Sequence, residues 1–148
     1  MGIHIGDKTS RIEANRDTYF ENDDTSTVLV KAAAGQDASN ELGASGGNAL
    51  DGIGSTRYSG GNGADQHMQE GGGGGGAAGS SGNGQSGAGQ IGGSATSEYG
   101  GPGGMGGDPG FNGSVPSADY GGGGGGAGSG KKSGAIGAGG HVRISYYA

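Results

Sequence analysis

The chain has 148 residues and 44 of them are glycine, about 30% of the sequence against a usual share of about 7%. Leucine, isoleucine, valine and phenylalanine together number only 16, which excludes a conventional apolar core over most of the length. Without cysteine there are no disulfides or thiolate metal sites, and a net charge of −6 gives no electrostatic support to binding of nucleic acid or anionic membranes.

The first 42 residues contain only three glycines but eight of the 14 acidic residues. Two short runs here, residues 2–6 (GIHIG) and 27–32 (TVLVKA), have the composition of β-strands, whereas residues 8–24 show no clean period. We therefore expect residues 1–42 to form an acidic N-terminal segment with short strands that serves attachment or assembly. The sequence shows no signal peptide and no apolar stretch of membrane-spanning length, so we expect a soluble protein.

From residue 43 onward, glycine-dense runs alternate with short segments that carry the bulky and charged residues. The six-glycine blocks at residues 71–76 and 121–126 are offset by 50 residues. This offset has two explanations: the chain contains a duplicated unit, or low-complexity sequence produced the match by chance. In the last segment, residues 141–147 (HVRISYY), Val142, Ile144 and Tyr146 alternate with Arg143, Ser145 and Tyr147, which predicts a β-strand. We expect residues 43–148 to form one glycine-rich module closed by this strand.

Such glycine-rich sequence has three physical interpretations. A collagen triple helix needs glycine at every third position and abundant proline, which the irregular spacing and three prolines exclude. A flexible linker is the default for glycine- and serine-rich chains, although a closing strand has no purpose at the end of a free coil. The third interpretation is polyglycine II, an extended left-handed helix with about three residues per turn and a rise of about 3.1 Å.

Polyglycine II helices have no internal hydrogen bonds, but neighbouring helices can bond N–H to C=O and pack closely. Interior helices need glycine, whereas outer helices can carry Ser, Ala, Asn or Gln on the solvent-facing third of positions, as in residues 79–89 (GSSGNGQSGAG). The expected fold is mostly irregular or extended. It is a layered bundle of polyglycine II helices with a few short β-strands, including a terminal strand pair, and little or no α-helix.

The chain also resembles a known family. The strand TSTVLVKAAAG, the runs GGGGGGAAGSSGNG, GGPGGMGG and GGGGGGAGSG, and the ending GAIGAGGHVRISYY are similar to the glycine-rich domains at the ends of bacteriophage tail fibres and adhesins. The resemblance covers residues 25–147. It implies layers of polyglycine II helices, two terminal strands that pair to close the module, and distal loops that contact a bacterial receptor.

On this chain the resemblance implies a closing pair of residues 27–31 and 142–146, with Val28, Val30, Val142, Ile144 and Tyr146 as strand residues. The candidate receptor loops are residues 55–59, 64–70, 94–99 and 108–120. Because helices that alternate in direction place successive loops at opposite ends, only about half of these loops can face a receptor together. The candidate receptor-contact residues are Arg57, Tyr58, His67, Met68, Tyr99, Phe111 and Tyr120.

Several strings resemble motifs of enzymes or cofactor sites, and each lacks its structural context. Residues 82–87 (GNGQSG) fit a dinucleotide-binding pattern without a flanking strand and helix, and residues 125–132 (GGAGSGKK) place Lys132 where a phosphate loop needs a hydroxyl. Residues 60–68 (GGNGADQHM) match the start of a calcium β-roll repeat in one copy only. We therefore expect no catalysis, no cofactor and no metal site.

The leading hypothesis is a structural, non-enzymatic phage virion protein whose polyglycine II module presents loops for receptor binding at a tail fibre or tail tip. We expect two partners, another virion protein and a bacterial outer-surface receptor, and neither nucleic-acid binding nor membrane insertion. The expected location is the virion tail or an extracellular appendage. The alternative is a self-assembling subunit of an extracellular glycine-rich filament. We expect a homo-oligomer or polymer. Ice binding by a flat polyglycine slab would favour a more regular repeat.

Overall fold

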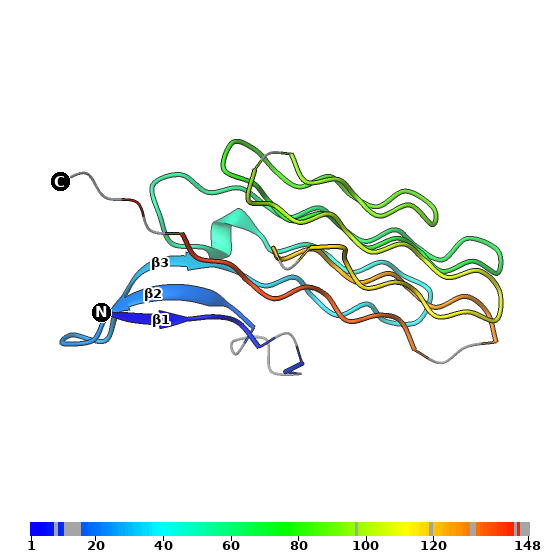
Figure 1. Ribbon diagram of the computed structural model, residues 1–148, viewed down its shortest axis with the longest axis horizontal. Helices are drawn as coiled ribbons and strands as arrows, with labels where there is room; N and C mark the ends of the chain where they lie inside the picture. Colours follow the sequence, from blue (N-terminus) through cyan, green and yellow to red (C-terminus); the bar gives the residue numbers. More distant parts are fainter. Residues whose placement is uncertain are drawn as a thin grey trace.

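The computed structural model describes residues 1–7, 9–10, 16–96, 98–118, 120–130, 133–143 and 145. A small antiparallel sheet is followed by extended, glycine-rich spans that run back and forth beside one another (Figure 1). The only helix among the described residues is the short 3₁₀ helix η2 (Ala49–Asp51). The prediction of a mostly irregular or extended fold with little or no α-helix is confirmed.

The sheet contains β1 (Gly2–His4), β2 (Thr18–Asn22) and β3 (Thr27–Ala32) in the order β1-β2-β3. Ile3, Phe20 and Val30 are in register across the three strands, and on the opposite face His4 stacks on Tyr19 with ring centroids 4.5 Å apart. The sequence predicts β1 and β3. It does not predict β2, where a register shift between Phe20 and Glu21 interrupts the simple alternation.

The expected closing pair is not found among the described residues. Val28 and Val30 lie in β3 as predicted, but β3 pairs with β2 and, at Lys31, with Ile53. Val142 lies in a described segment with no strand, while Ile144, Tyr146, Tyr147 and the motif residue Lys132 lie outside the described residues. The physical reason is proximity along the chain, since β2 precedes β3 by a tight turn and forms its ladder locally.

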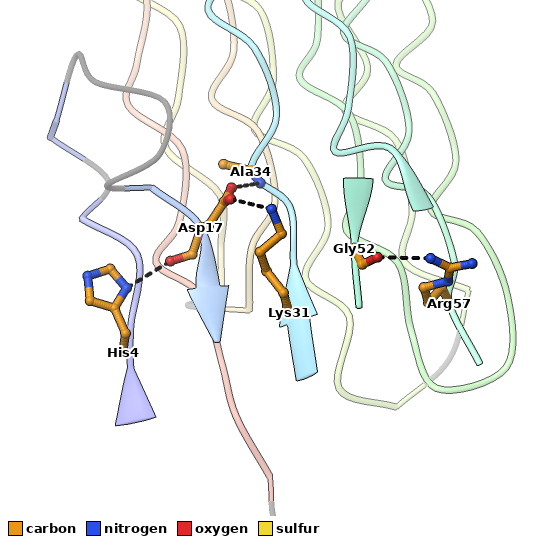
Figure 2. A network of polar contacts seen from close by, with 6 residues as sticks. All are labelled: His4, Asp17, Lys31, Ala34, Gly52 and Arg57. Carbon is orange, nitrogen blue, oxygen red and sulfur yellow. Dashed lines mark hydrogen bonds and ion pairs between the residues drawn. The ribbon is translucent and has the colours of Figure 1, made fainter. Parts of the chain in front are cut away.

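Asp17 joins the sheet to the first of the extended spans. Its carboxylate accepts a hydrogen bond from Lys31 Nζ at 3.1 Å and another from the backbone N–H of Ala34 at 2.9 Å, and its carbonyl oxygen contacts His4 Nδ1 at 2.9 Å (Figure 2). Nearby, the Arg57 guanidinium donates to the carbonyl of Gly52 and closes its own loop. These bonds fix the direction in which the chain leaves β3.

The span of residues 71–76 lies in the interior, and all six of its glycines are buried. Its contacts repeat every three residues. A methyl group added at three successive positions would strike three different neighbouring spans, and the next three positions would strike the same spans again. The carbonyl oxygens that it would strike are, in order along the span, those of Gly126, Ala64, Ile91, Gly123, Gly61 and Ser94, each within 2.4 Å. Only glycine therefore fits at these positions.

The hydrogen bonds of this interior span follow the same period of three. The N–H groups of Gly71, Gly74 and Ala77 donate to carbonyls of one neighbour, those of Gly107, Gly104 and Gly101. The carbonyls of Gly72 and Gly75 accept from Gly126 and Gly123, so the two six-glycine blocks of the sequence lie side by side. Backbone bonds between spans replace an apolar core, and no hydrophobic side chain is buried among the described residues.

The extended spans together form a stack. This stack begins earlier than glycine density predicts, after Ala32 and not after Leu42. Gln36 donates its N–H to the carbonyl of Ser45 at 2.9 Å, and a methyl group on Gly47 would strike the carbonyl of Ala33. This first span has few glycines because it lies at the edge of the stack, where most of its faces need no close backbone approach. Glycine density thus marks interior spans and misses the outermost one.

Candidate functional site

The spans alternate in direction, so their connections fall into two groups at opposite ends of the stack (Figure 1). We name as distal turns the four turns at residues 39–42, 67–70, 88–91 and 108–111, which lie at the end away from the sheet. They contact one another, since Gln66 donates its N–H to Glu41 and the Gln90 side chain donates to Asp108. A further connection, at residues 129–130, lies at the same end, where Ser129 donates its N–H to the carbonyl of Gln69; the remaining connections lie at the sheet end.

Each distal turn presents one exposed, large apolar side chain. The exposed fractions are 63% for Leu42, 86% for Met68, 67% for Ile91 and 67% for Phe111. Isolated apolar residues are common on surfaces, but here each of the four distal turns carries one. Repeated exposure of this kind is typical of a surface that binds a partner.

Met68 has a backbone conformation that a methionine adopts at a cost. Its φ is 54°, in the left-handed region, and the equivalent turns place Asn40 or Gly89 there. Those residues suit the left-handed region, whereas a non-glycine residue with a Cβ is strained by about 1–2 kcal/mol. A large apolar side chain held at a strained turn tip is consistent with selection for contact and not for folding.

The candidate residues of the sequence analysis are divided between the two ends. His67, Met68 and Phe111 lie in distal turns, whereas the segments of Arg57, Tyr58, Tyr99 and Tyr120 lie at the sheet end. Two of these three tyrosines, Tyr99 and Tyr120, pack against the C-terminal segment. Arg143 lies over the ring of Tyr99 with Cζ 4.4 Å from the centroid, and Tyr120 meets His141 edge-on at 5.1 Å. These tyrosines hold the last span in place.

Residues 108–120 do not form a single loop as expected. Residues 108–111 make a distal turn, in which Pro109 precedes Gly110 at a φ of 82° and Phe111 donates its N–H to Asp108. The following residues run back through the stack, where Gly113 would strike Gly125 if it carried a methyl group. Apolar residues in this edge span led the sequence analysis to expect a loop.

Two of the four apolar turn residues, Leu42 and Ile91, are not among the sequence-derived candidates. Leu42 ends the segment assigned to the N-terminal part, and Ile91 lies inside a long glycine-dense run. The spacing of turn ends is a signal for Ile91 alone, because Glu70, Ile91 and Phe111 follow one another at intervals of 21 and 20 residues, whereas Leu42 precedes Glu70 by 28. One span out and one span back set this interval.

The described residues offer little support for chemistry elsewhere. They contain no group of three or more His, Asp or Glu side chains placed to hold a metal ion. The hydroxyl and the N–H of Thr9 both donate to Asp7 and lower the pKa of that exposed carboxyl. Among the residues that the structure describes, no helix has the length and apolar character needed to cross a bilayer.

Comparison with known proteins gives no match: no protein-family model, no curated protein and no solved structure matches this chain.

Proposed function

We propose that this chain is a structural, non-enzymatic protein of a bacteriophage virion, whose polyglycine II module at a tail fibre or tail tip binds a receptor on the host surface. The distal turns form the binding end, and the sheet end faces the fibre. The observation that carries the proposal is the exposed apolar side chain on each of the four distal turns, opposite the sheet.

Support for the polyglycine II geometry comes from the contacts of residues 71–76. Their period of three matches a helix with about three residues per turn, and their hydrogen bonds go to other spans, as that helix requires. A stack of this kind is stiff without an apolar core. Stiffness suits a receptor-binding tip, because turns held on a rigid scaffold lose little entropy when they bind.

The proposal is tested with fluorescently labelled, purified chain and a panel of bacterial strains. The wild type should bind a subset of strains, and a Met68→Ala, Phe111→Ala double variant should lose most of this binding, because buried apolar and aromatic anchors dominate interfaces. A Tyr58→Ala variant at the sheet end is the matched control and should bind as the wild type does. Equal binding by the distal double variant, or no binding to any strain, contradicts the proposal.

A second candidate function, the self-assembling filament subunit, is favoured by one observation on the sheet. The row of Ile3, Phe20 and Val30 crosses all three strands, and Ile3 and Val30 are 56% and 54% exposed. An uncovered apolar row beside an open strand edge can join copies of a chain. Negative-stain electron microscopy of the purified chain distinguishes the two functions, since filaments support the subunit and discrete particles support the tip module.

A further inference from the structure

An open groove of about 580 Å³ lies on the surface of the stack, beside two of the distal turns. Its walls come from three spans, and its lining reaches His67 at one distal turn and Ala88 at another. This volume is within the range of small-molecule sites, about 300–1,000 Å³. The lining consists of small and polar residues, and its side chains with functional groups include Asn62, Asp65 and Ser86.

These three polar side chains are held in place by the neighbouring spans. Asn62 Oδ1 accepts the N–H of Gly46 at 3.0 Å, and Asp65 Oδ1 accepts the N–H of Gly43 at 2.8 Å. Ser86 Oγ accepts the N–H of Asn62 itself at 3.1 Å. Because each side chain is already ordered by a backbone donor, a ligand would order little on binding.

The same bonds determine which polar groups are left for a ligand. Asn62 keeps both amide N–H donors, Ser86 keeps its hydroxyl donor, and Asp65 keeps its second carboxylate oxygen as an acceptor. Donors and an acceptor therefore stand side by side along the groove. This combination matches hydroxyl groups, each of which donates one hydrogen bond and accepts others.

The chemistry of the lining argues against anions and metal ions as ligands. The lining contains no lysine or arginine, and Asp65 would repel an anion. A metal ion needs more ligands than this one carboxylate, and the described residues contain no cluster of three or more His, Asp or Glu side chains that could supply them. The donors and the acceptor of the lining match a neutral, polyhydroxylated ligand.

We propose that this groove binds a neutral sugar unit of a surface glycan. Gly63 and Gly87 contribute to the lining without side chains, so a sugar ring can approach the backbone between Asn62, Asp65 and Ser86. The inference rests on the proposed function, because the groove lies beside the distal turns, and it names the chemistry of the receptor at that end.

Saturation-transfer NMR on the purified full chain tests the groove directly, with glucose, galactose, mannose, rhamnose and N-acetylglucosamine as probes. At least one sugar should give a transfer signal with the wild type. Asp65→Asn keeps the oxygen that accepts from Gly43 but replaces the free acceptor with a donor, so that sugar should bind at least about tenfold more weakly. Asp51→Asn, an equal change of charge in η2, should leave binding unchanged.

Ser86→Ala provides a second variant, and circular dichroism with thermal denaturation verifies that each variant is folded. Loss of the signal in folded Asp65→Asn and Ser86→Ala, with the signal retained in Asp51→Asn, supports the groove. The proposal is overturned if no probe sugar binds the wild type, or if folded Asp65→Asn binds as tightly as the wild type.

The groove and the proposed function fail separately. If the wild type decorates bacteria through Met68 and Phe111 while no sugar binds, the groove is overturned and the receptor-binding function stands. If sugar binding depends on Asp65 while no strain is decorated, the groove stands and the proposed function fails.

Discussion

Gly74 lies in the middle of the interior span, and replacing it with alanine tests whether close backbone packing stabilises the protein. The added methyl carbon would lie 2.2 Å from the carbonyl oxygen of Gly123 and 2.6 Å from that of Gly124. Ordinary contact begins near 3.4 Å, so the neighbouring span must move by about 1 Å. That span donates hydrogen bonds to Gly72 and Gly75, and the movement weakens both.

The expected loss of stability follows from these terms. Overpacking of this kind costs about 1–3 kcal/mol, and each weakened hydrogen bond costs about 0.5–1.5 kcal/mol. Replacing glycine also restricts the unfolded chain, which returns about 0.4–1 kcal/mol. The net destabilisation is about 2–5 kcal/mol, a large part of the 5–15 kcal/mol that is typical of whole domains.

Urea denaturation followed by far-UV circular dichroism measures this change, and Gly139→Ala is the matched control. No heavy atom lies within 4 Å of the position of an added methyl group at Gly139, so that variant should be more stable by about 0.4–1 kcal/mol. The two identical substitutions therefore have opposite expected signs. Equal changes at both positions, or a Gly74→Ala variant as stable as the wild type, would refute close packing as the source of stability.

Three further predictions concern the junction, the distal turns and the C-terminal segment. Asp17→Ala removes the bond from the sheet to Ala34 of the first span and leaves the partly buried Lys31 of β3 unpaired, so thermal denaturation should show a loss of about 1–3 kcal/mol; an unchanged Tm contradicts this. Met68→Asn should be as stable as the wild type or up to about 1 kcal/mol more stable, since asparagine tolerates a φ of 54°. The same variant should bind cells less well than the wild type. A destabilised variant argues against backbone strain at Met68. Tyr99→Leu removes the ring beneath Arg143, so amide hydrogen exchange near residue 143 should be faster, with a global cost below about 1 kcal/mol; unchanged exchange there shows that other contacts hold the segment.

The sequence by itself determined which spans are interior. A span that carbonyls of neighbouring spans approach within the radius of a methyl group on three sides admits only glycine, and the six consecutive glycines of residues 71–76 form such a span. The strands at Thr27–Ala32 and near Gly2 are also predictable, because their apolar residues follow one another locally. Composition alone excluded an apolar core.

Only the tertiary structure decided which residues share an end of the molecule. Met68 and Phe111 belong with Leu42 and Ile91 because the spans alternate in direction and bring turns that are distant in sequence to one end. Tyr99 has the composition of a binding residue, yet it packs against Arg143, which is distant along the chain. The outermost span and the partner of β3 could not be predicted from the sequence either. An edge span needs few glycines, and strand pairing depends on which segment lies nearest in space.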